Sequence, residues 1–154
     1  AIKWEYPRLL GKKPKFEVIH ITQLVHQNIK KFKDQIKGKL KDTVTYHDPC
    51  DLARFGGIIE EPREIIRFLA QNFVEMPDHG LNALCCGGGG LLEAVDEKLR
   101  SSLSKTRIEQ AKSVGAKKLI VTCPVCKYYL SKASEGEPLE VKGLIELLLD
   151  NLTR

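Results

Sequence analysis

The sequence lacks the features that mark membrane-spanning and secreted chains. No apolar run is long enough to cross a bilayer, and the longest, residues 144–149, is interrupted by Glu146. No apolar core follows a charged start at the amino terminus, as a signal peptide would require. Internal repeats and low-complexity tracts are also absent. These absences favour a cytoplasmic domain without direct membrane insertion.

The chain also lacks an initiator methionine and opens on Ala1. We therefore expect it to be a piece of a longer protein. Its 154 residues are enough for one domain with a sizeable core. Hydrophobic residues make up 42% and charged residues 29%, which is typical of a globular chain. Residues 1–15, with Pro7, Gly11 and Pro14, are expected to form an irregular lead-in to that domain.

Arginine is missing from the lysine-rich part of the chain, between residues 12 and 41. The net charge is only +5. The one aromatic residue of the second lysine group, Phe32, falls on the apolar face of a predicted helix and so offers no platform for base stacking. We interpret the lysines as a solvated surface and expect no nucleic-acid partner.

Strand-like and helix-like segments alternate along the rest of the chain. Apolar residues spaced by three or four predict helices, and short β-rich runs closed by Pro or Gly predict strands. The predicted strands are residues 16–20, 42–47, 72–76, 117–122 and 139–141. The predicted helices are residues 21–36, 61–71, 91–114 (with an interruption near 101–102), 125–133 and 143–152.

This alternation predicts an α/β fold with a mostly parallel sheet and helices on both faces. In such sheets the functional site lies beyond the carboxyl ends of the strands. Cys50 and Cys123 each follow a predicted strand, and Cys85 and Cys86 lie in the loop between those strands. We therefore expect all five cysteines, including Cys126, to gather at that edge.

The cysteines form an unusual pattern around a run of glycines. A single Cys50 is followed after 34 residues by Cys85-Cys86, and after 36 more by Cys123-Pro124-Val125-Cys126. Gly87 to Gly90 follow the double cysteine directly. Four consecutive glycines are costly to order, so a folded domain keeps them where the backbone must approach another group closely. No Lys-Ser/Thr follows, as it would in a phosphate-binding P-loop.

Several interpretations of these cysteines remain open at this stage. Thiolates bind both iron–sulfur clusters and structural zinc. An adjacent pair suits a polynuclear cluster, in which neighbouring thiolates bind different irons, whereas zinc would use four of the five. Buried structural thiols would leave the glycines unexplained. A redox-active C-x-x-C pair alone would leave three cysteines without a role.

The spaced motif resembles the cysteine-rich CCG domain. That domain occurs in the B and D subunits of heterodisulfide reductases and in iron–sulfur subunits of glycerol-3-phosphate, glycolate and lactate oxidising systems. Residues 46–50, Tyr-His-Asp-Pro-Cys, and residues 61–63, Glu-Pro-Arg, match as well. The resemblance covers residues 44–126.

The resemblance implies an iron–sulfur cluster of the [4Fe-4S] or non-cubane type, bound by all five cysteines and used for electron transfer or disulfide reduction. The site residues that it implies are Cys50, Cys85, Cys86, Gly87, Gly88, Gly89, Cys123 and Cys126. Family members usually carry two CCG domains, so residues 1–154 resemble the C-terminal one of an oxidoreductase. The implied partners are a second CCG domain or a ferredoxin-like domain, with flavin or other electron-transfer subunits, some of them membrane-associated. A structural zinc module without redox activity is the alternative.

One departure from the family pattern affects the choice of catalytic residue. Many members have His directly after the first cysteine, but this chain has Asp51 there. His47, three residues before Cys50, is a candidate proton donor to a leaving thiolate or a hydrogen-bond partner of a ligand. His20, His26 and His79 are interpreted as ordinary strand-end or surface residues.

Overall fold

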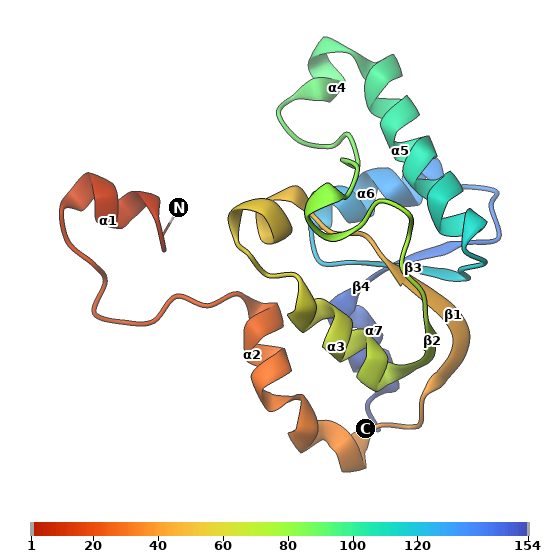
Figure 1. Ribbon diagram of the computed structural model, residues 1–154, viewed down its shortest axis with the longest axis horizontal. Coiled ribbons are helices and arrows are strands. Elements are labelled where there is room, and N and C mark those ends of the chain that lie inside the picture. The colour runs from red at the N-terminus through yellow and green to blue at the C-terminus, as the bar shows by residue number, and fades with distance from the viewer. Residues whose placement is uncertain (1, 154) are drawn as a thin grey trace.

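A four-stranded, all-parallel sheet forms the centre of the computed structural model, which describes residues 2–153 (Figure 1). The strand order is β2-β1-β3-β4. The strands are β1 (Leu40–Tyr46), β2 (Ala70–Phe73), β3 (Lys118–Val121) and β4 (Glu140–Gly143). The predicted α/β class and parallel sheet are therefore confirmed.

Helices and loops connect the strands. The helices are α1 (Glu5–Leu10), α2 (Ile21–Asn28), the 3₁₀ helix Ile29–Gln35, α3 (Glu60–Leu69), α4 (Leu92–Val95), α5 (Glu97–Ser113), α6 (Pro124–Ala133) and α7 (Leu144–Asn151). Two short turns of helix, Asp51–Phe55 and Gly80–Asn82, lie in the loops. Within residues 2–153, no helix is both long and apolar enough to cross a membrane.

The helices cover both faces of the sheet, as predicted. Alternate residues of β3 serve the two sides: Ile120 packs into a core with α3 and α7, whereas Leu119 and Val121 pack into a second core with α5 and α6. Ile65 and Leu147 belong to the first core. Side chains alternate between faces along a strand, so a four-residue strand such as β3 contributes to both cores.

Residues 16–20 are not a strand, although their composition is β-rich. They pair with no other segment of residues 2–153 and form an extended approach to α2. His20 caps that helix: its Nδ1 accepts a hydrogen bond from the Thr22 amide at 3.2 Å. Strand propensity does not make a strand without a neighbouring edge to pair with.

Four other expectations need correction. The lead-in is not wholly irregular, since it contains α1, which lies apart from the sheet (Figure 1). The long helix is interrupted at Asp96 rather than near residues 101–102, because the Asp96 carboxylate accepts from the Leu99 amide at 2.9 Å and caps α5. The predicted helix 21–36 is α-helical only as far as Asn28, and strand β2 begins two residues before the predicted 72–76.

Candidate metal centre

Three loops at the carboxyl edge of the sheet bring the cysteines together. Cys50 lies four residues beyond the end of β1, and Cys123 lies two residues beyond the end of β3. Cys126 is in the first turn of α6, and Cys85 and Cys86 lie in the loop before α4. The edge predicted from the order of strands is thus the edge at which the structure places them.

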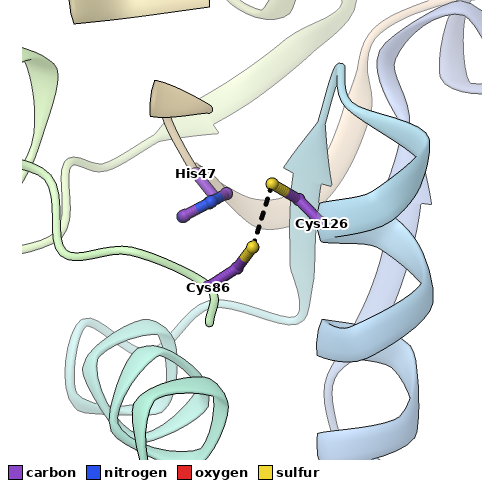
Figure 2. A group of neighbouring side chains, drawn as sticks. All are labelled: His47, Cys86 and Cys126. Atoms are coloured by element: carbon purple, nitrogen blue, oxygen red, sulfur yellow. Dashed lines mark hydrogen bonds between the residues drawn. The ribbon is translucent and has the colours of Figure 1, made fainter. Parts of the chain in front are cut away.

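The compact centre of the site consists of His47, Cys86 and Cys126 (Figure 2). Their potential ligand atoms all lie within 4.8 Å of one another, and all three side chains are buried. The Cys86 and Cys126 sulfurs are 3.1 Å apart and share a hydrogen bond, and neither forms a disulfide. Hydrogen bonds with Cys126 and Cys85 lower the pKa of the Cys86 thiol.

The other three cysteines are partly exposed and surround this centre. Cys85 hydrogen-bonds to Cys86, which raises the pKa of the Cys85 thiol. A hydrogen bond with Cys126, followed by bonds from the Cys126 and Val125 amides, lowers the pKa of Cys123 to about 6. Four of the five thiols therefore influence one another's pKa around the direct contact between the Cys86 and Cys126 sulfurs.

Two of the glycines hold the double cysteine in place. The amides of Gly87 and Gly88 donate to the sulfurs of Cys85 and Cys86 at 3.3 and 3.4 Å. Gly87 has φ of +82°, a conformation that favours glycine. A β-carbon on Gly88 would lie 2.4 Å from Cδ2 of Tyr129, whereas one on Gly89 would meet nothing within 4 Å. The close approach that the glycine run predicts is therefore to the protein's own groups at Gly87 and Gly88.

The difference between Gly88 and Gly89 provides a matched pair of variants. Gly88→Ala should lower the free energy of unfolding by about 1–3 kcal/mol, because a methyl group there overlaps Tyr129 and Val125. Gly89→Ala should change it by less than about 1 kcal/mol. Urea unfolding followed by circular dichroism measures both. Equal losses in the two variants would show that packing at Gly88 is not what the glycine run preserves.

His47 is held between the cysteines and an arginine. Its side chain is buried, and burial lowers the pKa of the imidazole, which keeps it neutral. Arg107 Nε donates to His47 Nδ1 at 3.2 Å, and the ring also hydrogen-bonds to Cys86. Arginine has no acceptor atom, so Nδ1 is the unprotonated nitrogen. Of the two roles expected for His47, this position favours the hydrogen-bond partner of a ligand.

A buried ion pair anchors the loop that carries His47 and Cys50. Arg63 binds Asp48 through two hydrogen bonds of 2.7 and 2.8 Å, and its Nε donates to Glu75 at 2.7 Å. The Gly80 amide also donates to the Asp48 carboxylate, at 2.7 Å. Both Arg63 and Asp48 are almost fully buried. The Glu-Pro-Arg segment is therefore a helix start that also fixes the position of the loop.

A cavity opens beside Cys123. It has a volume of about 250 Å³, and Cys123, His20, Asp51 and Leu52 contribute to its lining. A second cavity of about 170 Å³ shares Thr122, Cys123 and Pro124 with it. Cys123 is therefore partly exposed beside two cavities.

Two residues of the site, Arg107 and His20, do not follow from the sequence pattern. Arg107 lies on α5, a helix with many charged residues, and no spacing rule connects it to the cysteines. His20 was expected to be an ordinary residue. It precedes Cys123 by more than a hundred residues, and its place in the cavity depends on how α2 docks. Only the three-dimensional arrangement identifies these two residues.

Comparisons with known proteins identify the family to which this chain is similar. Residues 44–131 match the family model described as the CCG cysteine-rich domain. The D subunit of the dihydromethanophenazine:CoB–CoM heterodisulfide reductase of Methanosarcina acetivorans is 37% identical over 155 residues, covering 99% of this chain and 38% of that protein. The B subunit of the CoM/CoB fumarate reductase of Methanothermobacter marburgensis is 33% identical over 153 residues, covering 96% of this chain and 29% of that protein.

A bacterial protein is also similar to this chain. A probable iron–sulfur-binding oxidoreductase of Bacillus subtilis is 31% identical over 141 residues, covering 88% of this chain and 20% of that protein. The chain therefore spans between a fifth and two fifths of the length of these relatives.

Proposed function

The chain belongs to the CCG cysteine-rich domain family, and we propose that it is the iron–sulfur cluster-binding domain of an oxidoreductase of the heterodisulfide reductase type. The proposed ligands are Cys50, Cys85, Cys86, Cys123 and Cys126. The cluster would be of the [4Fe-4S] or non-cubane type.

The observation that carries this proposal is the 3.1 Å contact between the Cys86 and Cys126 sulfurs, which joins two distant segments that also contain Cys85 and Cys123. The donor set fits an iron–sulfur cluster, whose irons are bound by several thiolates and whose sulfurs accept hydrogen bonds from backbone amides. Gly87 and Gly88 already direct their amides at cysteine sulfurs in this loop.

A structural zinc site is the competing function. His47, Cys86 and Cys126 are close enough to share one small ion. Zinc takes four ligands, however, so at least one of the five cysteines would have no role. The His47 Nδ1 lone pair is occupied by the Arg107 Nε–H, so Nε2 is the imidazole nitrogen left to bind a metal.

The chain's own residues would position and protect the redox centre. A bound cluster supplies one-electron transfer, and two electrons with two protons convert one disulfide into two thiols. Cys86 and Cys126 are buried, so the interior of the site is shielded from water. The cavity at Cys123 is the side from which a disulfide or a partner would approach.

Electrons would come from other parts of a larger assembly. Relatives of this chain include named subunits of reductases and are much longer than the chain itself. We propose that a second CCG domain or a ferredoxin-like domain of the same protein, and flavin or other electron-transfer subunits, act as donors. We further propose a cytoplasmic location, with membrane association through partner subunits.

The test is a single-turnover oxidation. The chain is reconstituted without oxygen with iron and sulfide, reduced with dithionite, freed of excess reductant and mixed with bis(2-hydroxyethyl) disulfide. We expect the visible absorption to bleach on reduction and to return, with two thiols formed for every two electrons. If ferricyanide restores the visible absorption but the disulfide does not, the domain acts as an electron relay. Zinc-loaded protein is the control, and iron-loaded protein that does not bleach would overturn the proposal.

A further inference from the structure

Arg107 is a fully buried arginine whose hydrogen bonds do not include a carboxylate. Its Nε donates to His47 Nδ1, and its Nη1 donates to the Asp78 carbonyl at 2.8 Å and to the Gln110 amide oxygen. Within residues 2–153, its Nη2 has no acceptor although it is buried. The other two arginines with buried side chains are different: Arg63 binds Asp48 and Glu75, and Arg100 binds Glu97.

A buried charge is costly unless an opposite charge lies near it. The negative groups that act on Arg107 are Asp48, Asp78, Cys86 and Cys126. Asp48 is already bound by both Nη atoms of Arg63. Arg107 contacts His47, and His47 lies beside the two buried cysteines (Figure 2). Asp78, whose carboxylate accepts from Gln110 Nε2, compensates part of this charge. The other groups that can compensate it are these two cysteines, once a bound cluster holds them as thiolates.

We propose that Arg107 is a positioning residue whose positive charge compensates the thiolates of Cys86 and Cys126 and raises the reduction potential of the cluster that they hold. This inference rests on the proposed function. Reduction adds a negative charge to the site, and a fixed positive charge in a low-dielectric interior stabilises the reduced form more than the oxidised form. Through its bond to His47, the same guanidinium also fixes which imidazole nitrogen faces the cysteines.

The test separates the charge of Arg107 from its hydrogen bond. Arg107→Gln keeps an N–H donor for His47 but removes the charge, and Arg107→Lys keeps the charge. After anaerobic reconstitution, potentiometric titration gives the midpoint potential of each protein. We expect Arg107→Gln to lower the ratio of reduced to oxidised cluster about tenfold at a fixed potential, which corresponds to a midpoint potential lower by about 59 mV for one electron. We expect the midpoint potential of Arg107→Lys to be close to that of the wild type.

Arg100→Met is the matched control. Arg100 lies two helical turns earlier on α5, is 3% exposed and has no cysteine among the charges that act on it. Arg100 also approaches the double cysteine, since its Nη1 donates to Ser104, whose hydroxyl donates to the Cys86 carbonyl. Its removal should therefore shift the midpoint potential less than Arg107→Gln does. A role in packing alone would make the Arg107 and Arg100 variants alike.

The remaining outcomes are also decisive. Equal shifts in Arg107→Gln and Arg107→Lys, or no shift in either, overturn the proposal. Loss of iron from Arg107→Gln but not from Arg107→Lys supports the proposal, because the lysine variant keeps the positive charge and the glutamine variant does not. Equal loss of iron from both variants contradicts it. Iron and sulfide are measured in the wild-type sample as well, so that absence of a cluster there counts against the proposed function and not against Arg107.

Discussion

Cys86→Ser is expected to abolish cluster binding. Cys86 is the sulfur with the most partners in the site: it hydrogen-bonds with Cys126 and Cys85, interacts with His47 and accepts from the Gly88 amide. A serine oxygen is a poor substitute for a thiolate as a ligand of iron. The C–O bond of serine is also shorter than the C–S bond of cysteine, so the oxygen would not reach the position that the Cys86 sulfur occupies. We expect the bound iron after reconstitution to fall at least about tenfold, since even the loss of a supporting residue can weaken metal binding by that factor.

Two further variants define what this loss means. Val125→Thr changes the same Cys-Pro-Val-Cys turn without removing a sulfur, and because Val125 is 44% exposed the protein should bind iron normally. Cys85→Ser tests the five-ligand interpretation from the partly exposed side of the site. If the cluster forms normally in Cys85→Ser, Cys85 is not a ligand. If it forms normally in Cys86→Ser, the proposal that Cys86 lies at the centre of the cluster site is wrong.

Arg63→Met is expected to cost about 3–5 kcal/mol of unfolding free energy. The substitution leaves the Asp48 carboxylate buried with the Gly80 amide as its remaining close partner, and breaking a buried ion pair from one side has a cost of this size. A typical domain has only about 5–15 kcal/mol in total. Urea unfolding of the metal-free protein, followed by circular dichroism, measures the change.

Arg67→Met is the control, one turn further along α3. Its ion pair with Glu60 is 3.6 Å long and both side chains are more than half exposed, so we expect a loss below about 1 kcal/mol. Adding Asp48→Asn to Arg63→Met should recover part of the loss, because it removes the unpaired charge. A loss in Arg63→Met no larger than that in Arg67→Met would mean that the buried pair does not anchor the loop.

The parts of the fold that depend on local patterns are predictable from the sequence. Periodic apolar residues locate α3, α6 and α7, and β-rich runs locate β1 and β3. Residues 16–20 do not form the predicted strand because a strand also needs a neighbour, which local composition does not reveal. The helix interruption differs from its predicted place because a capping carboxylate at Asp96, rather than the two serines, ends one helix and begins the next.

The site is predictable to a different degree. Cysteines carry their chemistry in their identity and spacing, so the sequence alone is enough to propose five ligands. Arg107, Arg63 and His20 act through contacts with residues far away in the chain, and such contacts follow from docking of helices on the sheet. Arginines are common on exposed helices, so apart from the Glu-Pro-Arg match at Arg63 nothing in the sequence distinguishes the buried ones.

Metal and sulfide analysis of the anaerobically reconstituted chain tests the central claim most directly. The five-cysteine site predicts iron and acid-labile sulfide in near-equal amounts, with sulfur-to-iron charge-transfer absorption in the visible range. Reconstitution must precede the measurement, because purification in air can strip a labile cluster. Zinc alone, with no such absorption after reconstitution, would contradict the five-cysteine cluster and leave a structural zinc module in its place.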